Sequence, residues 1–145
     1  MRIFAAIVLT LGLVIPFSPA ATSAHHSFAS QFDNRVVMLH GVVASAEMIN
    51  PHSFIHLDVT APDGVVERWA LEGPGPLQVT RRGLPLDLVK PGDALGVCGY
   101  PAKNGARILQ AAVLTMPAGD QMVWSNYRQG KCGLDVAPPT PSVRP

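Results

Sequence analysis

All the histidines of this sequence lie in its first 56 residues: His25, His26, His40, His52 and His56. Neutral imidazole is the commonest metal ligand in proteins. If His25 were the first residue of the mature chain, its α-amine and its Nδ1 could chelate one metal ion in a six-membered ring. A third nitrogen, from His52 or His56, would complete a three-nitrogen site suited to copper(II), the tightest binder of the divalent series. His26 offers a second arrangement, in which the amine, a deprotonated amide and the His26 imidazole bind together.

The competing interpretation is that these histidines make only local hydrogen bonds. An arm that begins with two histidines can bond across a sheet, His52 can cap the turn in which it lies, and His40 fits an ordinary strand face. The sequence contains no Gly-Xaa-Ser-Xaa-Gly motif, no phosphate-binding glycine loop and no Cys/His nucleophile pair. Glu67 and Glu72, five residues apart on one expected strand, face opposite ways. We therefore predict no catalytic residues, and the sequence favours a binding role over an enzymatic one without deciding between them.

The first 24 residues have the three parts of a secretory signal peptide. Arg2 supplies the positive charge, an apolar run of about 13 residues follows, and small residues then lead to a cleavage region. That run is shorter than the roughly 20 residues needed to cross a bilayer. Cleavage after Ala24 would leave His25 as the first residue, whereas cleavage after Ala20 would destroy the amine chelate. We expect a periplasmic or secreted protein with no membrane anchor after cleavage.

Charge and cysteine content narrow the possible partners. Removing residues 1–24 removes Arg2 alone among the charged side chains, which leaves 10 basic and 10 acidic residues. A chain with no net charge and no basic cluster is a poor match for a nucleic acid backbone, so we expect no nucleic acid partner. Cys98 and Cys132 are the only cysteines, and in an exported chain a disulfide between them is expected. A thiol pair for a metal is the alternative.

The mature chain reads as short strands separated by turns. We expect an extended arm over residues 25–34, a β domain over 35–127, and a tail over 128–145 that is proline-rich and disordered from 133. Gly41 is expected at a bulge or bend. In Ser53–Thr60, Ile55, Leu57 and Val59 alternate with polar and aromatic residues. The expected strands are 35–48, 53–60, 65–72, 94–100, 107–116 and a short edge strand in 121–127, with a helical turn or two in 77–88.

Three strands, a short helical connection and two more strands is the order of an OB-type barrel. We therefore predict a mainly β protein with a five- to six-stranded OB-like barrel, and a small open sandwich is the alternative. Trp69 shares a strand face with Glu67, where it could line a groove or fill the core.

Several motifs taken together resemble a family of small exported bacterial proteins known only as a domain of unknown function. The resemblance covers residues 24–116 and implies export and a mature start at the His-His pair, without an established reaction. It rests on Ala24-His25-His26-Ser27-Phe28, Asn50-Pro51-His52, Trp69 with Glu72, Arg81-Arg82-Gly83 and Lys90-Pro91-Gly92-Asp93.

Three functions are compatible with the sequence. The first is a binding module, with copper held by His25 together with His26 or His52. The second is an interaction protein that docks another exported protein and holds no metal. The third is a small copper-dependent oxidoreductase. An intact His25 terminus is required by the first and the third.

Overall fold

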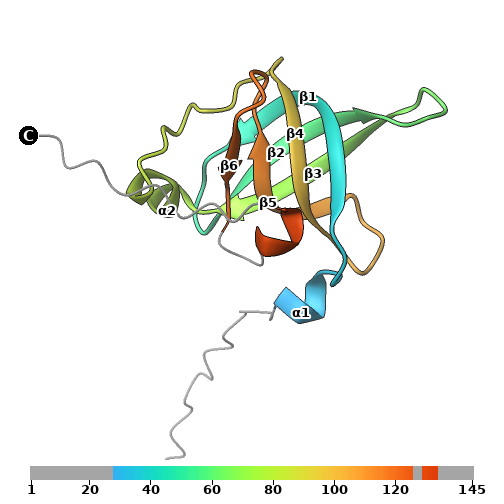
Figure 1. Ribbon diagram of the computed structural model, residues 1–145, viewed down its shortest axis with the longest axis horizontal. Helices are drawn as coiled ribbons and strands as arrows, with labels where there is room; N and C mark the ends of the chain where they lie inside the picture. Colours follow the sequence, from blue (N-terminus) through green and yellow to red (C-terminus); the bar gives the residue numbers. More distant parts are fainter. Residues whose placement is uncertain (1–27, 126–128, 134–145) are drawn as a thin grey trace, which may run out of the picture.

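A computed structural model describes residues 28–125 and 129–133, and its strands form one sheet that closes on itself (Figure 1). The strand order is β3-β2-β1-β4-β5-β6, and β3 also pairs with β5. The elements are α1 (Phe28–Gln31), β1 (Val37–Glu47), β2 (His52–Thr60), β3 (Val66–Pro74), α2 (Pro76–Arg81), β4 (Ala94–Pro101), β5 (Ile108–Thr115), β6 (Gln121–Val123) and the 3-10 helix η1 (Gln129–Cys132).

The closure between β3 and β5 makes a five-stranded barrel, with β6 added at the edge of β5. This closing pairing is parallel and short, and it joins Ala70, Leu71 and Glu72 to residues 108–110. The helix α2 follows β3 and begins with Pro76, a residue that suits the first turn because it has no N–H to satisfy. The prediction of an OB-like barrel with a helical connection after the third strand is therefore confirmed. The helices in the described ranges are too short and too polar to span a membrane.

The strand β1 is shared between two neighbours. Its first half pairs with β4, as in Gly41 with Leu95, and its second half pairs with β2. The register with β2 shifts between Val43 and Ser45. Of the two predictions for Gly41, a bulge or a bend, the bulge is wrong, because Gly41 pairs regularly with Leu95 and the irregularity lies at Ala44. Glycine is needed at 41 because a Cβ there would collide with the backbone carbonyl of Asp58.

The core lies inside the barrel and matches the predicted alternation of β2. Ile55 and Leu57 are fully buried, whereas Phe54 and His56 lie partly exposed on the outside. The inner cluster is formed mainly by aliphatic side chains from all five barrel strands together with Trp124, which follows β6. Burial of this apolar surface is the main force that holds the barrel closed.

Two boundaries differ from the prediction. The extended arm is wrong for residues 28–31, which form a helical turn that packs Phe28 against Tyr100 with ring centroids 5.2 Å apart. The third strand was expected to end before Gly73, but it continues to Pro74. Gly73 belongs in the strand because the indole of Trp124 covers it and leaves no room for a Cβ.

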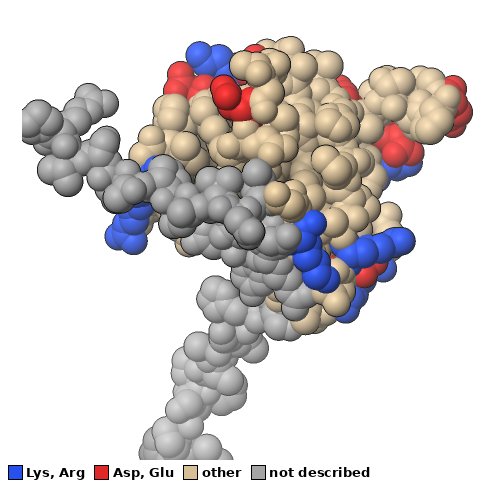
Figure 2. Space-filling view, in the orientation of Figure 1, with Lys and Arg blue, Asp and Glu red and all other residues tan. Residues whose placement is uncertain are grey.

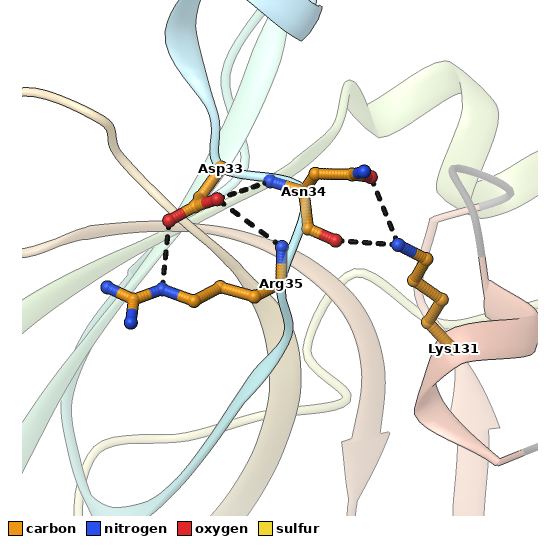
Figure 3. Close-up of polar contacts among 4 residues, drawn as sticks. All are labelled: Asp33, Asn34, Arg35 and Lys131. Atoms are coloured by element: carbon orange, nitrogen blue, oxygen red, sulfur yellow. Dashed lines mark hydrogen bonds and ion pairs between the residues drawn. The ribbon is translucent and has the colours of Figure 1, made fainter.

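A second apolar cluster lies on the outside of β4 and β5, under α1 and η1. The predicted disulfide between Cys98 and Cys132 is confirmed, and it ties η1 to β4. Lys131 Nζ also donates to the carbonyl oxygen and to Oδ1 of Asn34, at 2.7 and 3.0 Å (Figure 3). The beginning and the end of the described chain are thus fastened together on one side of the barrel. The predicted signal peptide, and the tail beyond Gly133, lie outside the described residues.

Candidate functional site

Two histidine–carboxylate pairs lie on the outer face of β1, β2 and β3. Phe54 of β2 stands between them, because its register partners are Glu47 on β1 and Glu72 on β3. His52 and His56 precede and follow Phe54 by two residues, so all three side chains project from the same side of β2. We call Glu47, His52, Phe54, His56 and Glu72 the histidine face.

His52 lies beside Glu72. Its Nδ1 is 3.1 Å from Glu72 Oε1, within ion-pair distance. The imidazole is 50% exposed, whereas the carboxylate is only 17% exposed. Gln110 Nε2 donates to the backbone carbonyl of Glu72 at 3.2 Å, which fixes this residue against β5. A half-exposed imidazole is therefore held at one nitrogen by a well-positioned carboxylate.

His56 makes the second pair, with its Nε2 3.4 Å from Glu47 Oε1. Four residues of strand separate His52 from His56, about 13 Å between their Cα atoms. The two pairs are therefore distinct. Over residues 28–125 and 129–133, no three His, Cys, Asp or Glu side chains come together in a way that could hold a metal ion.

An open hollow of about 550 Å³ adjoins the first pair. Glu72 lines it, so the residue that contacts His52 also borders the hollow. The helix α1 is held over it by Lys103, whose Nζ donates to the carbonyl of Ala29 at 2.6 Å. The lining residues come from α1, β3 and the segment that joins β4 to β5: Ser30, Gln31, Phe32, Glu72, Ala102, Lys103, Asn104 and Ile108.

The other carboxylates of these strands have arginine partners. Asp58 accepts two hydrogen bonds from Arg68, at 2.8 and 2.9 Å, and Glu67 accepts one from Arg107 at 2.6 Å. These arginine hydrogen bonds are the main cause of the lowered pKa of each carboxyl group. Within the described residues, Glu47 and Glu72 make no ion pair with lysine or arginine. This difference separates the histidine face from ordinary surface ion pairs.

The remaining candidate residues lie elsewhere. His25 and His26 are outside the described residues. His40 is exposed on β1, above Gly96 of β4, and joins neither histidine pair. Trp69 is half-buried and packs against the barrel core. The structure therefore brings His52 and His56 to one face, but not to one site.

The sequence reasoning missed the carboxylate partners, although the signal was present. The turn Pro62-Asp63-Gly64 joins β2 and β3, and extending that hairpin back by register places Glu72 opposite Phe54. Glu72 then lies diagonally across from His52. Diagonal neighbours of this kind are within reach of long side chains.

The comparisons with known proteins place the chain in a family. A family model described as "Family of unknown function (DUF6152)" matches residues 14–110. No curated protein and no solved structure gives a significant match. The matched range contains all the histidines, Glu72 and the strands that close the barrel as far as Gln110. Because the match covers more than half of the chain, the protein belongs to this family of unknown function.

Proposed function

We propose that this protein is an exported, non-catalytic binding module that holds copper(II) between its mature N-terminus and His52. The observation that carries the proposal is the position of His52, half exposed, with Nδ1 3.1 Å from Glu72 Oε1. A histidine that binds a metal through one ring nitrogen commonly donates the other N–H to a carboxylate, which fixes the tautomer and orients the ring. Glu72 supplies that carboxylate, and Nε2 is left for a metal.

The mature N-terminus would supply the other nitrogens. Cleavage after Ala24 makes His25 the first residue, with an α-amine and an imidazole that form one chelate ring. Three peptide units separate His25 from Phe28, the first residue of α1, so their Cα atoms are at most about 11 Å apart. Residues of α1 line the same hollow as Glu72. This common boundary supports a site that His25 and His52 share.

The donor set favours copper over calcium or magnesium. Two imidazoles and an amine are nitrogen ligands, which suit copper and zinc, whereas calcium and magnesium prefer oxygen. Copper(II) binds such ligands most tightly among the divalent first-row ions. The sequence motifs of common catalytic sites are absent, so we infer storage, delivery or sensing of the ion rather than a reaction.

The test is native mass spectrometry of the protein after export into a periplasm, purified without a tag or a chelator and then titrated with copper(II). We expect a mass that starts at His25, the two-dalton loss of one disulfide, and one tightly held copper ion. His52→Ala should weaken copper affinity more than about tenfold. His40→Ala is the matched control, because His40 is an exposed strand histidine away from the histidine face.

Two results would overturn the proposal. One is a mature chain that starts at Ala21 and so lacks the His25 amine. The other is copper binding that is equally strong in the parent, His52→Ala and His40→Ala proteins. Electron paramagnetic resonance gives an independent check, because His52→Ala should reduce the number of nitrogen ligands at copper from three to two.

A further inference from the structure

The outer face of β1 and β4 carries an uncovered apolar surface. Met38 is 65% exposed and Val42 is 49% exposed, with the exposed His40 between them on the same side of β1. Their register partners on β4 are small, since Met38 pairs with Cys98, His40 with Gly96 and Val42 with Ala94. We call the surface of Met38, His40, Val42, Ala94 and Gly96 the bare face.

The bare face contains no Asp, Glu, Lys or Arg and adjoins a shallow hollow. A hollow of about 210 Å³ borders it at His40, Ala94 and Gly96 and extends to Thr115, Met116 and Pro117. Gly96 itself is buried under the side chains of His40 and Thr115, because a Cβ there would stand only 3.1 Å from each of them. Figure 2 shows that Lys, Arg, Asp and Glu lie mainly at the borders of the visible barrel surface rather than across it.

The neighbouring half of the same outer surface is covered by the two ends of the described part of the chain. The helices α1 and η1 lie over the cluster that contains Tyr100, Val113 and the Cys98–Cys132 disulfide. Cys98 is the register partner of Met38. The covered half and the bare face therefore meet at the disulfide. Gly133, the last described residue, directly follows Cys132 of this bond.

The residues that follow match the bare face in composition and reach. Residues 134–145 carry four prolines, several aliphatic side chains, one Asp and one Arg. A proline-rich segment advances about 3.1 Å per residue in the polyproline II conformation, and such segments dock in apolar grooves with little loss of entropy. Four residues of β1, about 13 Å, separate Met38 from Val42. A tether at Cys132 also raises the effective concentration to the millimolar range.

We propose that residues 134–145 dock on the bare face. They would then cover the outer surface of β1 and β4 next to the part that η1 covers. The occupant is a segment of this chain, anchored beside Met38 by the disulfide and by the contact of Lys131 with Asn34. The tail then occupies an apolar surface that a second protein would otherwise meet. This proposal is independent of copper binding at the histidine face.

Methionine methyl NMR on the full mature chain tests the docking. After signal cleavage the chain has four methionines. Met38 is exposed on the bare face, and Met116 borders both the adjoining hollow and the inner core. Met48 and Met122 pack against the inner core away from that hollow and serve as internal references. The test variant is Val136→Asp with Val143→Asp. The matched control is Thr140→Asp with Ser142→Asp, which adds the same charge to the same segment at polar positions.

We expect the Met38 and Met116 methyl signals to shift in the test variant and to move much less in the control, while Met48 and Met122 stay in place. Peroxide should also oxidise Met38 several-fold faster in the test variant than in the parent. Equal spectra for all three proteins would overturn the proposal, because the tail would then not touch this face. Signals that change with protein concentration would also overturn it, in favour of a second copy as the occupant.

Discussion

Four carboxylates on β1, β2 and β3 fall into two classes according to the base beside them. Asp58 and Glu67 meet arginines, which are always charged, and their pKa values are lowered by those hydrogen bonds. Glu47 and Glu72 lie instead within ion-pair distance of histidine nitrogens, at 3.4 Å from His56 Nε2 and 3.1 Å from His52 Nδ1. The first class forms permanent surface ion pairs. The second class orients two imidazoles on one face, and within the described residues neither carboxylate has a lysine or arginine beside it.

The Glu72 carboxylate provides a residue-scale test of the proposed copper site. Glu72→Gln removes the negative charge beside His52 Nδ1 but keeps the shape of the side chain, so the imidazole should be a weaker and less well oriented ligand. We expect a loss of copper affinity of about 10- to 100-fold, measured by competition with a chromogenic chelator. Glu47→Gln is the control, because its partner is His56. Equal losses in both variants would contradict a site at His52.

Gly73 illustrates a second residue-scale constraint. Its Cα faces the buried indole of Trp124, and the Cβ of an alanine would overlap that ring. Gly73→Ala should therefore lower the free energy of unfolding by about 1 to 3 kcal/mol, as overpacking in a core does. Urea denaturation measures the change. Gly96→Ala is the comparison, since its Cβ would stand 3.1 Å from side-chain atoms of His40 and Thr115 and would not overlap a buried ring. A smaller loss for Gly73→Ala than for Gly96→Ala would refute this account.

At the scale of elements, the β2–β3 hairpin positions most of the histidine face. Its register is regular from His52 with Pro74 to Thr60 with Val66, so one turn fixes nine cross-strand pairs. Asp58 and Arg68 face each other directly in this ladder and make a two-point ion pair. The hairpin thus brings Glu72 next to His52 at one end and an arginine–carboxylate pair nearer the turn.

Acid titration should reveal the contribution of this cross-strand pair. Arg68 holds the pKa of Asp58 below its ordinary value of 3.8, so the unfolded chain binds this proton more readily than the folded chain. The stabilisation is complete above the ordinary value and is lost as pH falls through the lower folded-state pKa. Between about pH 5 and about pH 2, Asp58→Asn should therefore lose less stability than the parent protein. Urea midpoints measured across this range provide the comparison.

Asp120→Asn is the control for the acid titration, because Asp120 makes no ion pair within the part of the chain that the structure describes. It should follow the parent curve. If Asp58→Asn also followed the parent curve, the Asp58–Arg68 pair would contribute nothing to the acid sensitivity of the fold.

Local patterns predicted the strands, but not every contact between them. Alternation along β2 and the Pro62-Asp63-Gly64 turn were sufficient to predict the hairpin and the buried positions of Ile55 and Leu57. The bulge at Ala44 was missed because its cause is the sharing of β1 between β2 and β4, which no local pattern carries. The path of β3 past Gly73 depends on Trp124, about 50 residues later, and such long-range packing overrides local breaking signals. The pairing of His52 with Glu72 follows from the hairpin register, which must be extended from the turn to its far end before the two residues meet.

At the scale of the whole molecule, the barrel core and the disulfide stabilise different parts of the fold. The inner cluster holds the five strands together, whereas the Cys98–Cys132 bond fastens η1 and the outer cluster to β4. The sequence separation of the two cysteines is 34, so the bond closes a loop that includes β5 and β6. In the unfolded chain this bond therefore lowers the conformational entropy of the segment from Cys98 to Cys132.

Replacing both cysteines measures that restriction. Cys98→Ala with Cys132→Ala should lower the free energy of unfolding by about 3 to 4 kcal/mol in the chain-entropy model. Chemical denaturation of the two proteins, with no reductant present, gives the difference. At denaturant concentrations below its unfolding transition, the double variant should keep the far-ultraviolet circular dichroism of the barrel, because the inner cluster includes neither cysteine. A stability equal to that of the parent would show that the bond adds nothing beyond the packing around it.

The position of Glu72 has a consequence for how the barrel opens. Its backbone belongs to the short parallel closure between β3 and β5, and its side chain contacts His52. Ligand binding and barrel opening are then joined by thermodynamic linkage, since a ligand that recognises only the closed form makes opening less favourable. A hundredfold excess over the dissociation constant adds about 2.7 kcal/mol to the free energy of opening. Amide exchange at Leu71 and Glu72, two residues of this closure, would then report occupancy of the histidine face.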